Sequence, residues 1–280
     1  MSSPRVSIVL PTYQSAPFVE ATMRSVLAQT FTDLEVVVAD HASTDGTWDL
    51  LQQFTADHRV RLMRTEAGGG ASRNWKTVTD AACGDLLKLV CADDLLYPSC
   101  VAEQVSALDE APSAAMVACR RDIVDARGAT VFRARGLPKM DGLVRGDTAV
   151  RRTVRGGTNM LGEPACVTVR RSVLADVGGW ADGHPYVIDQ ATYAKVLRLG
   201  DLVAQPRALA AFRLSAQQWS VSLAREQARQ VAAFHRSLLD DYGVVSVTDV
   251  RIGNARALAI AYLRRLVYLR LGSRMHAEPT

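Results

Sequence analysis

Short apolar runs alternate with segments of helical periodicity through the first 110 residues, and this alternation limits the possible folds more than any other feature. The apolar runs lie at 5–10, 34–39, 59–64 and 86–91. Each is followed by a stretch in which apolar residues recur three or four positions apart, as on one face of a helix. Such alternation predicts right-handed crossovers and a mainly parallel sheet with helices on both faces. We therefore expect an α/β fold.

The rest of the chain is less regular. We expect a strand at 114–119, a hairpin at 122–135 and a polar, glycine-rich connection without regular structure at 137–157. Helical periodicity returns at 188–199, and from about residue 221 the sequence predicts helix almost throughout. The chain therefore ends in a helical extension of the α/β domain.

Composition excludes several classes of protein. The 280 residues are 48% hydrophobic and 22% charged, as in ordinary globular domains. Apolar runs such as 36–39 are far shorter than the roughly 20 residues that cross a bilayer. The balance of 33 basic and 29 acidic residues does not require a nucleic-acid partner. We expect a cytoplasmic protein whose five cysteines are reduced thiols, and no Cys-x-x-Cys pattern indicates structural zinc.

The expected strands of the first half end in residues suited to binding. These are Pro11, Thr12 and Tyr13, then Asp40 and His41, and finally Asp93 and Asp94. Ligands of parallel α/β sheets bind at the carboxyl ends of the strands. The Asp93–Asp94 pair is the strongest feature, because Mg²⁺ and Mn²⁺ prefer carboxylate oxygens and often bridge one or two of them to phosphates. Helix capping is the alternative role, and the buried strand before the pair favours function.

Other polar residues have structural explanations as well as functional ones. Asp45 lies in the first turn of an expected helix, where capping is the favoured role. Arg73 follows the glycines at 68–70, which form either a loop that carries it to a ligand or a plain turn. Asp189 starts a helix, and capping alone would explain it. Phosphate-binding glycine patterns and a Gly-x-Ser-x-Gly elbow are absent from the sequence.

In combination, these segments resemble family 2 glycosyltransferases of the GT-A fold. The resemblance rests on Val6–Tyr13, Ser25–Phe31, Asp40–Thr47, Ala71–Asn74 and Ala92–Asp94, with weaker matches at Gly178–Trp180 and Ile188–Ala191. It covers roughly residues 5 to 215. It implies an inverting transfer of a sugar from a nucleotide diphosphate sugar to an acceptor hydroxyl.

The resemblance also implies roles for particular residues. Pro11, Thr12 and Tyr13 would line the nucleotide pocket, with Asp40, His41 and Arg73 near the base. Asp93 would face the ribose or the sugar, Asp94 would hold Mn²⁺ or Mg²⁺ on the diphosphate, and Asp189 would be the general base. Residues 1–110 would then form the donor half, 111–220 the acceptor half, and 221–280 the helical extension.

Two positions depart from many members of that family. His41 replaces an acid that matches the uracil contact, which leaves UDP, dTDP and GDP sugars open as donors. Ser215 replaces the histidine of an Arg-x-His pattern that can complete the metal shell. These departures favour the alternative function, a catalytically decayed nucleotide-sugar-binding or scaffold protein. Retention of the Asp93–Asp94 pair and Asp189 argues against it.

The acceptor and the partners are left open by the sequence. A carbohydrate, a lipid-linked molecule or a small molecule could accept the sugar, and residues 162–164, Trp180 and His184 could line its site. A core position is the favoured explanation of Trp180. The tail at 251–274 is basic and amphipathic. It could lie on the inner face of a membrane, but packing on its own domain or on a second subunit is slightly favoured.

Overall fold

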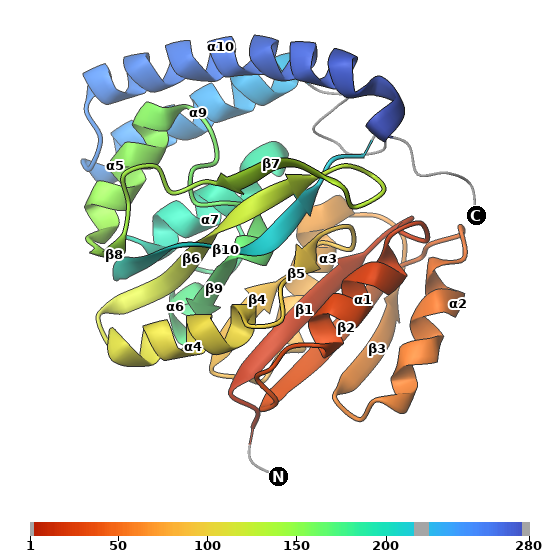
Figure 1. The fold of residues 1–280 in the computed structure, drawn as a ribbon. Helices are drawn as coiled ribbons and strands as arrows, with labels where there is room; N and C mark the ends of the chain where they lie inside the picture. The colour runs from red at the N-terminus through yellow and green to blue at the C-terminus, as the bar shows by residue number, and fades with distance from the viewer. Residues whose placement is uncertain (1–2, 216–223, 276–280) are drawn as a thin grey trace.

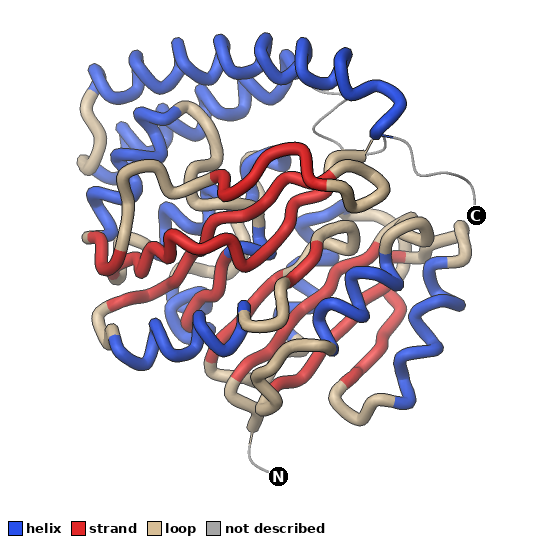
Figure 2. Tube along the Cα trace, in the orientation of Figure 1, coloured by secondary structure: helices blue, strands red, loops and turns tan. Residues whose placement is uncertain are grey.

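The computed structural model describes residues 3–215 and 224–275 (Figure 1). Ten strands form one sheet in the order β3-β2-β1-β4-β9-β6-β10-β5, with β7 paired to β6 and β8 to β10. Figure 2 shows the strands in the middle of the molecule with helices around them. The strands are β1 (Val6–Thr12), β2 (Leu34–His41), β3 (Val60–Thr65), β4 (Leu86–Leu89), β5 (Leu95–Leu96), β6 (Ala114–Val124), β7 (Thr130–Arg135), β8 (Gly142–Val144), β9 (Val167–Arg170) and β10 (Asp201–Arg213).

The first half has the predicted alternation of strands and helices. Strand β1 is parallel to both β2 and β4, and β2 is parallel to β3. Every residue of β1 is buried, as expected for a central strand covered on both faces. The connecting helices are α1 (Val19–Leu27), α2 (Thr47–Gln52), α3 (Gly70–Asp80) and α4 (Cys100–Glu110). Parallel pairing therefore brings the carboxyl ends of β1, β2 and β4 to one edge.

The second half completes the sheet with mixed pairing. Strand β9 is antiparallel to β4 and β6, whereas β10 is parallel to β6. The hairpin predicted at 122–135 is confirmed by the antiparallel pairing of β6 and β7. The flanking helices here are α6 (Arg171–Asp176) and α7 (Ile188–Val196). The α/β prediction is confirmed, while the mainly parallel arrangement is confined to the first half and the β6–β10 pair.

The prediction of an irregular connection at 137–157 was wrong. This stretch contains β8 and the helix α5 (Gly146–Gly156). The buried side of α5 consists of Ala149, Val150, Thr153 and Val154, which lie on one helical face. Glycines at both ends and several arginines on the outer side gave the segment its loop-like composition. Burial of a narrow apolar stripe outweighed that composition.

Two long helices complete the chain. They are α9 (Ala224–Tyr242) and α10 (Val247–Leu271), and α10 packs on both α9 and α5 (Figure 1). A Cβ atom added at Gly253 would lie 2.1 Å from the carbonyl oxygen of Val154, so only glycine allows α10 to approach α5 so closely. The helical extension was predicted, and its expected start at residue 221 lies outside the described residues. Within 3–215 and 224–275, no helix is long and apolar enough to cross a membrane.

Candidate active site

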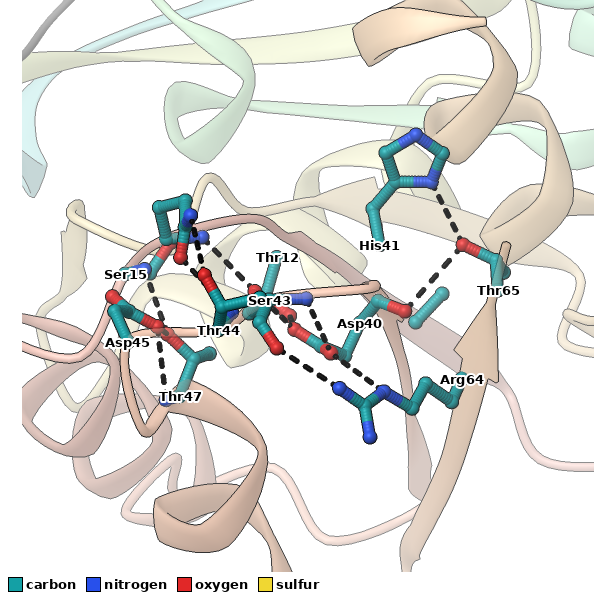
Figure 3. A network of polar contacts seen from close by, with 12 residues as sticks. Thr12, Ser15, Asp40, His41, Ser43, Thr44, Asp45, Thr47, Arg64 and Thr65 are labelled. Carbon is teal, nitrogen blue, oxygen red and sulfur yellow. Dashed lines mark hydrogen bonds and ion pairs between the residues drawn. The ribbon is translucent and has the colours of Figure 1, made fainter. Parts of the chain in front are cut away.

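Asp40 organises the loop that follows β2 (Figure 3). Its side chain is 0% exposed, and Oδ1 accepts hydrogen bonds from the hydroxyls of Thr12 at 3.1 Å and Ser43 at 2.6 Å. Oδ2 accepts the backbone N–H of Ser43 at 3.1 Å and lies 3.6 Å from Nε of Arg64. Ala42 has a φ of 52°, and this left-handed turn lets the chain fold back over the carboxylate. Both oxygens are thus engaged by the protein itself.

His41 and Tyr13 lie beside that loop. Nδ1 of His41 is 2.8 Å from the Thr65 hydroxyl, whereas its buried Nε2 has no hydrogen-bond partner among the described residues. The Tyr13 ring meets the His41 ring edge-on, with centroids 6.1 Å apart, and Tyr13 is 60% exposed. Buried polar atoms in proteins are nearly always paired. The unpaired nitrogen is therefore a group that a ligand could engage.

Asn74 joins the ends of the two central strands. Its side-chain amide donates to the carbonyl oxygens of Thr12 at 3.2 Å and Ala39 at 3.1 Å. Its Oδ1 is buried without a partner in the described part of the chain. Arg73, the residue before it on α3, is exposed. Asn74 was not singled out in the sequence, although it belongs to the segment Ala71–Asn74 that carries the family resemblance.

Asp45 lies just before α2 rather than in its first turn, and its role is structural. It accepts hydrogen bonds from the N–H and hydroxyl of Thr47, at 3.0 and 2.6 Å, at the start of α2. Its other oxygen accepts the N–H of Ala16 at 3.0 Å. These bonds lower the pKa of Asp45, although burial of the carboxyl group opposes them. Asp45 therefore links the loop after β1 to the start of α2, one residue before the N-cap, Gly46.

Asp94 follows β4 and differs from Asp40 in its bonding. Its side chain is 1% exposed, and Oδ1 accepts only the backbone N–H of Arg213, at 3.2 Å. Oδ2 is buried and lacks a partner among the residues the structure describes. Burial, together with the nearby charges of Asp93 and Glu163, raises the pKa of Asp94 well above its ordinary value. The protein thus holds one carboxylate oxygen of Asp94 and leaves the other without a described hydrogen bond.

The backbone around Asp94 is fixed from two sides. The Thr22 hydroxyl of α1 donates to the carbonyl oxygens of Ala92 and Asp94, at 3.0 and 2.9 Å. From β10, Nε of Arg213 donates to the carbonyl oxygen of Asp93 at 2.9 Å. The same guanidinium reaches the carbonyl oxygen of Ala126 at 3.0 Å. The loop that carries the two acids is therefore rigidly attached to both halves of the sheet.

Asp189 lies in the first turn of α7, and like Asp94 it is influenced by the charge of Glu163. Its Oδ2 accepts a hydrogen bond from Asn159 at 2.7 Å, and its Oδ1 accepts the N–H of Gln190 at 2.8 Å. Loss of water around the carboxyl group raises the pKa of Asp189 to about 7, with the negative charge of Glu163 adding to the increase. The positive charge of Arg121, which pairs with Glu163 at 2.6 Å between Nε and Oε2, lowers the pKa of Asp189 and so counteracts part of this increase. Glu163 thus acts electrostatically on both Asp94 and Asp189.

With this geometry established, comparison with known proteins places the chain in a family. The model of the family described as "Glycosyl transferase family 2" matches residues 7–178. This span is more than half of the chain and includes Asp40, Asp94 and Glu163. The chain belongs to glycosyl transferase family 2. It is a glycosyltransferase, as the resemblance implied.

Several relatives share only part of their length with this glycosyltransferase. "Uncharacterized protein MT1568" of Mycobacterium tuberculosis is 27% identical over 250 residues, which are 85% of this chain and 74% of that protein. "Putative teichuronic acid biosynthesis glycosyltransferase TuaG" of Bacillus subtilis is 34% identical over 92 residues, covering 32% of this chain and 36% of TuaG. "Chondroitin synthase" of Escherichia coli is 37% identical over 100 residues, covering 35% of this chain and 14% of the synthase.

Solved structures have the same fold. The S. aureus TarS 1–349 complex with UDP-GlcNAc superposes with a TM-score of 0.67 at 16% identity, covering 94% of this chain and 73% of that one. The mannosyltransferase PcManGT from Pyrobaculum calidifontis, in complex with GDP-Man and Mn²⁺, gives a TM-score of 0.63 at 19% identity. That match covers 98% of this chain and 80% of PcManGT. The chain therefore has the same fold as these two proteins.

The residues of this glycosyltransferase can accommodate a divalent cation. Asp94 offers a buried carboxylate oxygen without a protein partner, in a site whose negative charge destabilises it. No group of three or more His, Cys, Asp or Glu side chains in the described ranges is arranged to hold a metal alone. Ions such as Mg²⁺ are commonly bound by one or two carboxylates together with substrate phosphates. Asp94 fits a metal that is completed by the donor.

On the acceptor side, Trp180 is a packing residue. Its indole N–H donates to the Thr79 hydroxyl at 2.7 Å, and its ring meets that of Trp75 edge-on with centroids 5.0 Å apart. This agrees with the core position favoured from sequence. His184 packs with its ring centroid 6.4 Å from that of Phe234 in α9. The polar groups that act on Asp189 include Asn159, Glu163 and Arg121.

Proposed function

We propose that this glycosyltransferase is an inverting, metal-assisted enzyme in which Asp189 is the general base. The observation that carries the proposal is the pair of buried carboxyl groups beside Glu163. Asp94 has an unpaired oxygen and Asp189 has a pKa of about 7. Acidic groups in one site with different surroundings commonly have different chemical roles.

The donor side of the proposal uses the carboxyl edge of β1, β2 and β4. Thr12 and Pro11 form the buried floor, and Tyr13 is an exposed aromatic ring beside His41. We infer that Nε2 of His41 bonds to the nucleotide base and that Arg73 approaches it from α3. Asp40, in contrast, acts through the loop that it holds, because its own oxygens are engaged by Thr12, Ser43 and Arg64. Asp93 is assigned to the ribose or the sugar.

Asp94 is assigned to a Mn²⁺ or Mg²⁺ ion. Such an ion would act as a Lewis acid that stabilises the negative charge of the leaving nucleoside diphosphate. The chain holds the Asp94 carboxylate for this purpose through the backbone N–H of Arg213 and excludes water from it. The three contacts that fix the backbone of residues 92–94 keep the carboxylate in one position.

Asp189 is assigned to the acceptor. A carboxyl group with a pKa of about 7 is partly ionised at neutral pH and still basic enough to take a hydroxyl proton during attack. Positioned bases typically accelerate such reactions about 10²–10⁴-fold. Asn159 fixes the orientation of the carboxylate. Attack from the side opposite the diphosphate inverts the sugar carbon in one displacement, which needs no covalent intermediate.

These assignments give each part of the chain a separate role. Residues 1–110 bind the donor, 111–220 supply the acceptor side, and the C-terminal helices contact a membrane or a second subunit. The acceptor hydroxyl belongs to a carbohydrate, a lipid-linked molecule or a small molecule.

A thermal-shift or calorimetric screen of UDP, dTDP, GDP and CDP, each with Mn²⁺ or with chelator, tests the donor site. We expect one nucleotide to stabilise the protein in the presence of the metal and Asp94→Ala to lose the metal-dependent part. Stabilisation that is equal with metal and chelator would contradict the assignment of Asp94. Nucleotide binding without sugar transfer to any acceptor would favour the alternative function, a catalytically decayed nucleotide-sugar-binding or scaffold protein. The family departures at His41 and Ser215 are the sequence features in favour of that alternative.

A further inference from the structure

The side of α10 that faces away from the protein is unusually apolar. Leu258, Tyr262 and Leu263 are 51%, 64% and 60% exposed, and Val247 at the start of the helix is 52% exposed. The opposite side, which includes Gly253 and the buried Ala257, packs on α5 and α9. A surface helix normally turns charged and polar residues outward. Half of the exposed large hydrophobic residues in the described chain lie on this one helix.

The same side is strongly basic. Arg251, Arg265 and Arg270 are exposed, and none of them has a hydrogen-bond or ion-pair partner among the described residues. The only acidic residue of α10 is Asp249, which is 0% exposed and paired with Arg151 and Arg155 of α5. We call the surface formed by Val247, Arg251, Leu258, Tyr262, Leu263, Arg265 and Arg270 the α10 outer face.

An apolar groove adjoins the α10 outer face. It lies between α9 and α10, has a volume of about 580 Å³, and includes Leu239 and Val250 in its lining. Val247 and Arg251 belong to both the groove and the outer face, and Arg236 lines the groove from α9. An apolar hollow beside arginines matches a molecule that has a hydrocarbon part and an anionic head.

We propose that the α10 outer face binds an anionic lipid bilayer. Leucine and tyrosine side chains on one side of a helix can enter the boundary between headgroups and acyl chains, and arginines beside them pair with lipid phosphates. A second copy of the chain is a poorer match. A two-fold interface would bring the same surface of each subunit together. The arginines would then face arginines, with no exposed acid of α10 to pair with them.

The inner side of α10 connects this surface to the acceptor side. Arg264 donates to the hydroxyls of Thr158 at 2.7 Å and Tyr186 at 3.2 Å. Thr158 precedes Asn159, whose amide holds the carboxylate of Asp189. Lipid binding would therefore hold the proposed acceptor side at the bilayer, an extension that rests on the proposed function. The lipid contact itself does not depend on it.

Co-sedimentation of the full chain with vesicles tests the proposal. We expect binding to vesicles that contain phosphatidylglycerol, little binding to pure phosphatidylcholine, and weaker binding at high salt because charges are screened. The triple variant Arg251→Ala, Arg265→Ala, Arg270→Ala should bind on the order of 100-fold more weakly, since each arginine near an anionic surface contributes about fivefold. Its control replaces Arg24, Arg145 and Arg207 by Ala, which are 72%, 81% and 67% exposed on other elements.

A second pair of variants tests the apolar part. Leu258→Glu with Leu263→Glu should abolish vesicle binding, whereas Leu143→Glu with Leu199→Glu should leave it intact, since both control leucines are 57% exposed elsewhere. Circular dichroism and thermal unfolding verify that all variants fold. Equal loss in variants and controls, or equal binding to both vesicle types, would overturn the proposal. So would absence of vesicle binding combined with a dimer in sedimentation velocity that the Leu258→Glu, Leu263→Glu variant dissociates.

The vesicle measurement requires neither donor nor acceptor. A chain that binds vesicles but transfers no sugar would contradict only the proposed function, and an active chain that ignores anionic vesicles would contradict only the lipid proposal.

Discussion

Asp40 and Asp94 occupy equivalent places in the sheet but have opposite bonding states. Each lies at or just after the carboxyl end of a parallel strand, and each is almost fully buried. Asp40 uses both oxygens on Thr12, Ser43 and Arg64. Asp94 has one bond, from the backbone of Arg213, and an oxygen without a described partner.

The proposed assignment explains this difference, with Asp40 as a framework acid and Asp94 as a ligand-binding acid. Burying a carboxylate costs free energy that hydrogen bonds must offset. For Asp40, hydrogen bonds and an ion pair within the protein offset this cost, so the residue stabilises the fold. Asp94 retains most of that cost, as expected for its proposed role in binding a cation or substrate.

Replacing Asp94 should have the largest effect on sugar transfer and little effect on stability. We expect Asp94→Asn to reduce sugar transfer about 10³-fold or more, because the metal's stabilisation of the leaving group is worth several kcal/mol. The free energy of unfolding should not fall, since a poorly paired buried charge is removed. Initial rates with saturating metal and urea unfolding measure the two effects. Activity close to wild type would contradict the metal assignment.

Replacing Asp189 should remove catalysis without removing donor binding. We expect Asp189→Asn to lower transfer about 10²–10⁴-fold, because an amide cannot take the acceptor proton. Calorimetry should give a nucleotide affinity equal to that of the wild type. Gln190→Ala, which retains the backbone N–H that bonds to Asp189, is the neighbouring control and should retain most activity. A variant that loses donor affinity along with transfer would contradict the assignment of a base.

Replacing Asp40 should produce the reverse pattern. We expect Asp40→Ala to lower the free energy of unfolding by about 2–3 kcal/mol, because buried donors from Thr12 and Ser43 lose their acceptor. Transfer should fall only as far as the nucleotide affinity does. Urea unfolding and nucleotide titration measure these effects, with Asp49→Ala, an exposed acid on α2, as the control. A free energy of unfolding equal to that of the wild type would contradict the structural role of Asp40.

Sequence patterns predicted the regular part of this molecule well. Strands β1 to β4 are short apolar runs between periodic helices, so local spacing alone predicts their parallel pairing. The segments Asp40–Thr47 and Ala92–Asp94 likewise identified the site because they end those strands. Helix α5 was missed because glycines and arginines concealed its apolar stripe. Its helical state depends on packing against α10, which no local pattern contains.

The environment of the acids could not be predicted. Glu163 was expected only to line the acceptor side, and Asn159 was not singled out. Their positions beside Asp189 follow from the way that the segment before and including η2 (Pro164–Cys166) packs against β4, β6 and β10. The bonding of Asp40 and Asp94 likewise depends on Arg64 and Arg213, which come from other strands. Residue type and strand position predicted where the site lies, whereas the tertiary fold determines what each acid does.

The smallest expected effect is on the pH dependence of sugar transfer, which reports the pKa of the proposed base, Asp189. Since the pKa of Asp189 is about 7, its carboxyl is mostly protonated below that pH and cannot accept a proton. The rate at saturating substrate should therefore rise with pH and reach half of its maximum near pH 7. The groups that face Asp189 are Glu163, which raises its pKa, and Arg121 and the N–H of Gln190, which lower it.

Asn159 provides the test of this interpretation. Its amide donates to the ionised carboxylate and so favours the charged form. Asn159→Leu should therefore move the midpoint to higher pH, by up to about one unit for one hydrogen bond. Trp180→Phe, which loses the hydrogen bond to Thr79 and part of the ring that packs on Trp75, should leave the midpoint unchanged. A midpoint that stays at the wild-type value in Asn159→Leu would mean that Asp189 does not limit the reaction, even if the variant is slower.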